Sequence, residues 1–165
     1  EMGGNIQVFN HSSFGKEPVA DLNIKSSVLN ACEVTSGDVP NLIDELPILF
    51  IASCFAEGIS SFIEIEELKH KESDRLKAMQ DGLDKMKIKN YLDGNVFCIE
   101  GMGKDYKSPN FLAETYYDHR IAMSFAIAGL NSNSYIEIAS PECINTSFPE
   151  FIELGKRLGC NFEIS

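Results

Sequence analysis

Two stretches of the sequence are apolar at nearly every position and have the length of a helix. Residues 42–58 (LIDELPILFIASCFAEG) place Asp44 at the expected N-cap, Pro47 in the first turn and Gly58 at the expected end. Residues 118–130 (DHRIAMSFAIAGL) repeat this pattern and also open with an aspartate. Because a helix that is apolar on all sides is normally buried, we predict two buried helices.

Two other segments alternate apolar and polar residues with the period of a helix. In residues 72–86 (ESDRLKAMQDGLDKM), leucines and methionines recur at helical spacing and charged residues lie between them. Residues 147–159 (SFPEFIELGKRLG) are similar, with Ser147 as the expected cap and Pro149 in the first turn. The pattern predicts two amphipathic helices that each bury one face.

Strands are predicted where apolar and polar residues alternate between these helices. Residues 60–68 (SSFIEIEEL) and 134–141 (SYIEIASP) alternate in this way, and residues 160–165 (CNFEIS) read as the start of a further strand. Two short apolar runs flank Asp93 and Gly94, a pair that favours a two-residue hairpin turn. The sequence therefore predicts a chain of mixed α/β class.

The order of buried helix, strand and amphipathic helix occurs twice. Matched positions lie 73 or 74 residues apart: Asp44 and Asp118, Phe62 and Tyr135, Ser73 and Ser147. This spacing predicts an internal repeat of one supersecondary unit. Residues 1–10 resemble residues 85–93 and 157–165, where a helix closes and a strand follows. We therefore expect the chain to begin inside a unit and to be a truncated part of a longer protein.

The composition limits the possible partners. With 165 residues, of which 44% are hydrophobic, the chain can form one core of ordinary size. Its net charge of -11 disfavours non-specific binding to nucleic acid or to an anionic membrane. We expect any anionic ligand to bind in a locally basic pocket.

The cysteines and histidines do not show the spacing of a metal site. The five cysteines are scattered without a C-x-x-C pair, and the three histidines lie far apart. We therefore expect reduced, mostly buried cysteines and no metal. No secretory signal opens the chain and its longest apolar run is too short to cross a bilayer, so we expect a cytoplasmic protein.

Residues 69–79 (KHKESDRLKAM) crowd charges of both signs in front of a predicted helix. Lys71 and Arg75 are four positions apart, and Glu72 and Arg75 are three apart, so all three can share one end of the helix. A helix N-terminus also presents free backbone N–H groups, which suit phosphate or carboxylate. The alternative interpretation is a solvated helix start, with Ser73 as its cap and the charges in weak surface ion pairs.

Five motifs match one enzyme family in their order and spacing. They are DELP at 44–47, FAEG at 55–58, EELKHKESDRL at 66–76, DHRIAM at 118–123 and SFPEF at 147–151. Together they cover almost the whole chain. They resemble the 5-enolpyruvylshikimate-3-phosphate synthase family, also called 3-phosphoshikimate 1-carboxyvinyltransferase.

The resemblance implies a fold of two similar lobes, each made of three βαβαββ units with buried helices inside and sheets outside. Residues 1–165 would then be part of the C-terminal lobe, namely the end of one unit and about two further units, without the N-terminal lobe. The implied reaction transfers the enolpyruvyl group of phosphoenolpyruvate to the 5-hydroxyl of shikimate 3-phosphate and releases phosphate. It belongs to the shikimate pathway of aromatic amino-acid biosynthesis and uses no metal or organic cofactor.

Such a reaction needs cations for an anionic substrate and groups that move protons. By the resemblance, Arg75 and Arg120 are ligands of the phosphoenolpyruvate anion, a role suited to the planar fork of arginine. Lys71 would lie between the two substrates. Glu72 would handle the proton at the methylene carbon. Asp44 would bind hydroxyls of shikimate 3-phosphate and accept a proton, and the alternative is that Asp44 only caps its helix.

Two further residues line the site that the resemblance implies. His119 would lie beside phosphoenolpyruvate. Thr146 stands where many family members carry a lysine just before the S/T-F-P motif. Threonine donates a hydrogen bond but brings no charge, so either another basic residue compensates or the anion binds more weakly.

Two other functions remain open at this point. A sister class of enzymes shares the repeated fold but transfers enolpyruvyl to a nucleotide sugar. Alternatively, the chain could be a non-catalytic module that binds a protein through its acidic surface. If the chain is a non-catalytic module, we expect the predicted site residues to be scattered over the surface of the fold. If it is part of an enzyme, we expect them to lie close together. These residues are Asp44, Lys71, Glu72, Arg75 and Arg120. The truncated face could also support a dimer.

Overall fold

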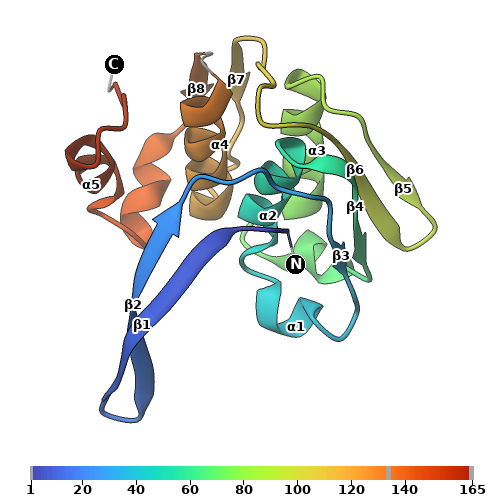
Figure 1. The fold of residues 1–165 in the computed structure, drawn as a ribbon. Coiled ribbons are helices and arrows are strands. Elements are labelled where there is room, and N and C mark those ends of the chain that lie inside the picture. Colours follow the sequence, from blue (N-terminus) through green and yellow to red (C-terminus); the bar gives the residue numbers. More distant parts are fainter. Residues whose placement is uncertain (1, 133–134, 164–165) are drawn as a thin grey trace.

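The structure, a computed structural model, describes residues 2–132 and 135–163 (Figure 1). The chain opens with a hairpin of β1 (Asn5–Phe14) and β2 (Glu17–Lys25). The central elements are β3 (Glu33–Val34), α1 (Val39–Leu42), α2 (Leu46–Cys54), β4 (Glu57–Ile63), the 3-10 helix η1 (Glu66–His70), α3 (Arg75–Lys85), β5 (Asn90–Asp93) and β6 (Val96–Met102). The last elements are β7 (Phe111–Ala113), α4 (His119–Ser132), β8 (Ile136–Ile138), the 3-10 helix η2 (Pro141–Thr146) and α5 (Phe151–Arg157).

The element order recurs along the chain, in agreement with the spacing of matched residues. The series β3, α2, β4, η1, α3 is followed by the series β7, α4, β8, η2, α5. In both series the two strands pair in parallel, β3 with β4 and β7 with β8. The first series continues with β5 and β6, and β6 pairs antiparallel with β4 to give the sheet order β3, β4, β6, β5.

The core lies where the helices meet the four-stranded sheet. Helix α2 contacts α4, α3 and β6, and Figure 1 shows these helices on one side of the sheet. Phe50 of α2 lies edge-on to Phe62 of β4 and Phe97 of β6, with ring centroids 4.7 and 5.1 Å apart. The strongly apolar sequence of α2 is therefore explained by contacts on several of its sides. No helix of the described residues is long and apolar enough to cross a membrane.

The helix caps differ from the sequence predictions in three of four cases. Helix α4 has the predicted cap, since Asp118 accepts a hydrogen bond from the Arg120 backbone N–H at 2.9 Å. Helix α2 begins after Glu45 without a side-chain cap, because the Asp44 carboxylate binds Arg75 instead. In α3 the cap is Asp74, which accepts a hydrogen bond from the Lys77 backbone N–H.

Two helix boundaries were also predicted wrongly. Helix α2 ends at Cys54, and Gly58 lies inside β4 with a φ of 102°. Helix α5 begins only at Phe151 and has no side-chain cap, whereas Ser147 follows η2. The reason is local, because Pro149 disfavours helical geometry at the residue before it.

Four predictions about strands and their turn also need correction. The strand predicted for residues 60–68 ends at Ile63 in β4, and residues 66–68 belong to η1. Asp93 pairs with Val96, so the hairpin loop is Gly94 and Asn95 rather than Asp93 and Gly94, and Gly94 supplies the positive φ of 62°. Residues 160–163 form no strand in the described part, and residues 164–165 lie outside it. The strand predicted for residues 134–141 is shorter, since β8 covers Ile136–Ile138, and residue 134 also lies outside the described residues.

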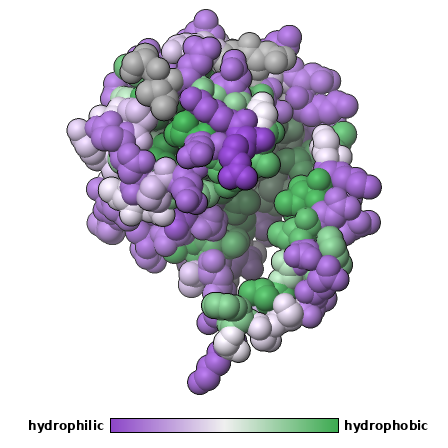
Figure 2. All heavy atoms as spheres, turned by 90° about the vertical axis from the view of Figure 1, so that its left-hand side faces the viewer, coloured by the Kyte–Doolittle hydropathy of each residue, from purple (hydrophilic) through white to green (hydrophobic). Residues whose placement is uncertain are grey.

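The β1–β2 hairpin projects from the body of the molecule (Figure 1). The strand expected near the start of the chain is present, but it pairs with β2, and no helix precedes it in residues 2–4. Ile6 pairs with Ile24 and Val8 with Leu22, so these four side chains share one face, and all of them are exposed. Figure 2 shows apolar side chains gathered along this projecting arm.

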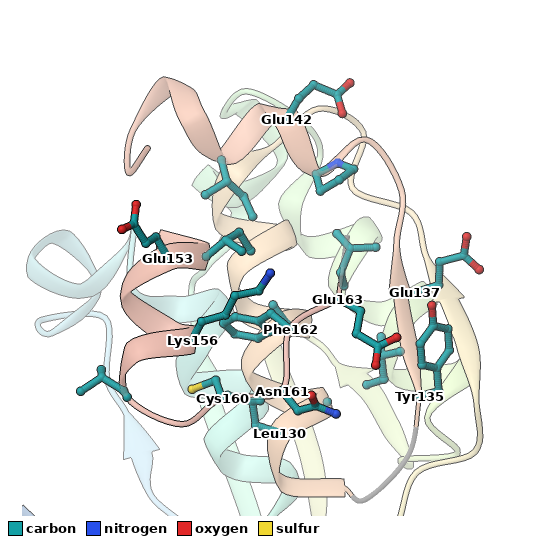
Figure 3. A pocket seen from close by; sticks show the side chains of 18 of the residues that line it. Leu130, Tyr135, Glu137, Glu142, Glu153, Lys156, Cys160, Asn161, Phe162 and Glu163 are labelled. Carbon is teal, nitrogen blue, oxygen red and sulfur yellow. The ribbon is translucent and has the colours of Figure 1, made fainter. Parts of the chain in front are cut away.

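A second apolar surface lies beside β8. Among the described residues, β8 pairs with β7 on one edge and with no strand on the other, whereas β4 has both edges paired. In the first series, β6 pairs with the second edge of β4, and the β6 residues Phe97 and Ile99 are buried. Beside β8, a cavity of about 1220 Å³ lies between α4, β8, η2 and α5. Figure 3 shows it between Lys156 on α5 and Glu137 on β8.

Candidate active site

Arg75 lies at the centre of a cluster of charged side chains where α2, α3 and α4 begin. Its side chain is only 1% exposed. Nε donates a hydrogen bond to Asp118 at 2.8 Å and NH1 donates one to Asp44 at 2.8 Å. NH2 donates to Glu72, one turn earlier in sequence. Each nitrogen of this guanidinium therefore faces a carboxylate.

Two further cations approach the same place from other elements. The Arg120 guanidinium donates from NH1 to the backbone carbonyl of Asp44 and to the Glu45 carboxylate, both at 2.7 Å. Lys71 lies 2.9 Å from Glu67 and 3.7 Å from Asp44. These contacts join residues up to 76 positions apart in sequence. We call this group the ion-pair cluster, which comprises Asp44, Glu45, Glu67, Lys71, Glu72, Arg75, Asp118 and Arg120.

Carboxylates outnumber cations in the ion-pair cluster. Three cations face five carboxylates, so the cluster has two formal negative charges in excess. The sequence predicted a locally basic pocket, but in the folded chain each cation is paired with a carboxylate of the same chain. An incoming anion can therefore bind the buried Arg75 only by displacing Asp44 or Glu72 from its guanidinium.

The ionised state of these groups is favoured by their neighbours. For Asp44, partial burial raises the pKa, but the hydrogen bond from Arg75 and the charges of Arg120 and Lys71 lower it more, so the net pKa is below the ordinary value. For Lys71, the hydrogen bond to Glu67 raises the pKa above its usual value. For Arg75, burial lowers the pKa, but the contacts with Asp118 and Asp44 raise it more.

The structure brings together five of the seven predicted site residues. They are Asp44, Lys71, Glu72, Arg75 and Arg120, which is the convergence expected of an enzyme and not of a scattered surface. His119 is the first residue of α4 and lies next to the cluster in sequence. Thr146 ends η2, and its hydroxyl donates to the Cys143 carbonyl. Within the described residues, no hydrogen bond or ion pair links His119 or Thr146 to the cluster.

The sequence analysis assigned no site role to four residues that contact the cluster. Glu45 pairs with Arg120, and Glu67 pairs with Lys71. The Ser73 hydroxyl donates a hydrogen bond to Asp118, which also accepts one from Arg75. The sequence predicts Asp118 only as the residue that opens its helix. A buried carboxylate directly before a histidine and an arginine was the available signal for a second role. In residues 2–132 and 135–163, no group of acidic, histidine or cysteine side chains could hold a metal ion.

The family profile and the curated relatives that match this chain belong to the same family. The profile of EPSP synthase (3-phosphoshikimate 1-carboxyvinyltransferase) matches residues 1–154. The 3-phosphoshikimate 1-carboxyvinyltransferase of Zymomonas mobilis is 45% identical over 99% of this chain, and that of Rhizobium johnstonii is 43% identical over 99%. In both cases the chain spans 37% of the relative's length.

Solved structures agree with the sequence matches. The EPSP synthase of Acinetobacter baumannii superimposes with a TM-score of 0.93 at 41% identity, and it covers 99% of this chain and 38% of its own. The enolpyruvyl transferase NikO of Streptomyces tendae has a TM-score of 0.63 at 17% identity, which is a likeness of fold alone. The motifs, the mixed α/β fold and these matches together place the chain in the EPSP synthase (3-phosphoshikimate 1-carboxyvinyltransferase) family.

Proposed function

We propose that residues 1–165 are part of an enzyme that transfers the enolpyruvyl group of phosphoenolpyruvate to the 5-hydroxyl of shikimate 3-phosphate. The observation that carries this proposal is the convergence of Asp44, Lys71, Glu72, Arg75 and Arg120 from three helix starts. Membership of the family supports the choice of substrates. The cytoplasmic location stays a prediction.

The repeated element order supports a finer description of the fold. We propose that the two series of elements are consecutive βαβαββ units of a C-terminal lobe and that the β1–β2 hairpin closes the unit before them. The buried α2 and α4 would then be the inner helices and the sheets the outer layer. On this proposal, the N-terminal lobe of such an enzyme would lie outside these residues.

The reaction has two steps that need proton transfer. In the first, the 5-hydroxyl oxygen bonds to C2 of phosphoenolpyruvate while the methylene carbon takes up a proton, which gives a tetrahedral intermediate. In the second, the methyl group loses a proton and the bond from C2 to the phosphate oxygen breaks. We assign Asp44 as acceptor of the hydroxyl proton and Glu72 as the group that gives and takes the proton at carbon. Both carboxylates are about half exposed, so substrate can reach them.

The three cations of the cluster differ in how easily an anion can reach them. Arg120 is partly exposed, and its NH1 group is held by an exposed carboxylate, Glu45, which an anion can replace. Arg75 is buried, so an anion reaches its NH1 or NH2 edge only by displacing Asp44 or Glu72. Lys71 shares a carboxylate with Arg75 and would lie between the two substrates. We keep His119 and Thr146 as proposed residues of the substrate site.

The test is a titration of the purified 165-residue chain followed by amide resonances. We expect phosphoenolpyruvate to shift the resonances of Arg120 and its neighbours, and Arg120→Ala to abolish the shifts. Lys104→Ala, which removes a cation outside the cluster, is the matched control. Shifts produced equally by inorganic sulfate, or no shifts at all, would contradict the assignment. A shift with a uridine diphosphate sugar but not with shikimate 3-phosphate would favour the sister reaction.

A further inference from the structure

Asp118 is a carboxylate without access to solvent in the middle of the ion-pair cluster. Its side chain is 0% exposed, and it belongs to the residue directly before α4. An unpaired charge in this position would be strongly unfavourable, so its partners must account for it. Those partners come from two separate elements.

Both oxygens of Asp118 are used, and they bind the two arginines in different ways. Oδ2 accepts hydrogen bonds from Arg75 Nε at 2.8 Å and from the Ser73 hydroxyl at 3.1 Å. Oδ1 accepts one from the Arg120 backbone N–H at 2.9 Å. The backbone N–H of Asp118 itself donates to the Thr115 carbonyl at 2.9 Å. One carboxylate therefore joins the start of α3 to the start of α4.

The other partners of Arg75 differ from Asp118 in their exposure. The side chains of Asp44 and Glu72 are 48% and 53% exposed, so water or a ligand can compete for Arg75 NH1 and NH2. Nothing from solvent can compete for the Nε bond to Asp118. Arg75 is thus held from the inner side, while the edge that suits a carboxylate or phosphate faces the open side.

We propose that Asp118 is a positioning residue that fixes Arg75 and the start of α4, with Arg120, in the geometry that receives the phosphoenolpyruvate anion. This inference rests on the proposed function. The physical reason is that an arginine already held in place loses less conformational freedom when it binds an anion. Ser73 supports the same arrangement, because its hydroxyl ties the segment of Lys71 and Glu72 to the same carboxylate.

The first measurement requires no substrate. In the 165-residue chain, the Nε–H resonance of Arg75 should exchange slowly with water, because its acceptor is buried. Asp118→Asn removes the charge but keeps the shape, and it should make this resonance exchange rapidly. Asp81→Asn is the matched control, since Asp81 pairs with Lys77 on the outer face of α3. A slow Arg75 resonance in folded Asp118→Asn would overturn the positioning role.

The second measurement is the affinity for phosphoenolpyruvate from the same titration. We expect Asp118→Asn to weaken the affinity about 10-fold or more and Ser73→Ala to weaken it about threefold. The amide spectra of both variants should remain those of a folded protein. Affinity within about twofold of the parent for both variants would overturn the proposal. If Asp118→Asn does not fold, Ser73→Ala decides, since it removes one donor to the intact carboxylate and leaves Arg75 unchanged.

The two proposals fail in different ways. Failure of the parent chain to bind phosphoenolpyruvate would count against the proposed function and against the role of Asp118 in anion binding. The Arg75 exchange rate would still decide whether Asp118 holds that side chain. Binding by the parent with unchanged affinity in the variants would leave the function intact and remove Asp118 from it.

Discussion

At the scale of single residues, the site is a set of charges that hold one another before any substrate binds. Arg75 uses three nitrogens on three carboxylates, and Arg120 uses one nitrogen on a carbonyl and a carboxylate. Removing one member therefore leaves its partners partly unpaired. The effect of a substitution depends on whether the lost partner is buried, as Asp118 is, or open to water, as Glu45 is.

In the complete enzyme, Arg120→Ala should weaken the binding of phosphoenolpyruvate by about 2 to 5 kcal/mol. It should weaken the binding of shikimate 3-phosphate much less. The reason is that Arg120 is the partly exposed cation whose carboxylate partner can be exchanged for a ligand anion. Isothermal titration with each substrate measures the two losses separately. Equal losses for both substrates would instead indicate that the substitution damages the fold.

Glu72→Gln should keep substrate binding but lower turnover about 100-fold or more, as expected when a proton-transfer group is removed. Glutamine can still accept the hydrogen bond from Arg75, so the arginine keeps a partner. The measurement is phosphate release in the complete enzyme under saturating substrates. Glu66→Gln, a change outside the cluster in η1, is the control. Unchanged turnover would remove Glu72 from the mechanism.

The lowered pKa of Asp44 gives a pH dependence of stability. A carboxyl whose pKa is lower in the folded than in the unfolded state stabilises the fold above its unfolded pKa of about 3.9. That contribution is lost as the pH falls through the lower, folded value. We therefore expect urea unfolding to show a loss of stability below about pH 4 that is smaller in Asp44→Asn. The same substitution at Asp105, an exposed carboxylate outside the cluster, is the matched control.

At the scale of elements, the residues of the cluster lie at or near the helix starts, and contacts between the helices fix the relative positions of those starts. The starts of α3 and α4 are tied by Asp118, and lower down the two helices approach closely at Gly82. A Cβ built on Gly82 would lie 1.9 Å from the Phe125 ring of α4. Glycine at this helical position is therefore a packing requirement and not a turn signal.

Gly82→Ala should destabilise the protein although alanine favours helices. Helix propensity gains about 1 kcal/mol, but the overlap with Phe125 forces the helices apart, and such overpacking costs about 1 to 3 kcal/mol. The change is measured as a shift of the urea midpoint. Phe125→Leu in the same background should restore part of the loss. A gain in stability from Gly82→Ala alone would show that α3 and α4 are not packed as described.

At the scale of the whole molecule, the described chain leaves two apolar surfaces uncovered. One is the face of the β1–β2 hairpin formed by Ile6, Val8, Leu22 and Ile24. The other is the cavity beside β8, which is lined in large part by apolar residues of α4, β8 and α5. Surfaces of this kind normally contact other parts of a protein or another molecule.

The isolated chain should therefore self-associate through the hairpin. Light scattering at increasing concentration should show a mass above that of one chain, whose value is 18.3 kDa. Ile6→Lys together with Leu22→Lys should return the chain to a monomer, because charges on the paired strands oppose contact between two such faces. Glu17→Lys, at the exposed end of β2, is the control. A monomeric parent at all concentrations would refute the expectation.

The repeat and the main elements could be derived from the sequence because their signals are local. The apolar run of α2, the spacing of leucines and methionines in α3 and the matched positions of the two series all lie within short segments or recur at a fixed distance. Family motifs pointed to five residues that the fold then brings together. The errors fall at helix starts and caps, at the hairpin loop, which lies at Gly94 and Asn95, and at the last predicted strand, which residues 160–163 do not form.

The partners of each charge were decided only by the tertiary structure. Asp44 has the sequence position of a helix cap, but Arg75, 31 residues away, binds its oxygen, so the helix begins without a cap. Asp118 has the same local signal and does cap its helix, yet it also holds Arg75 across 43 residues. Local sequence shows which side chains can pair. Because hydrogen bonds act over about 3 Å, only the packing of α2, α3 and α4 determines which of them do.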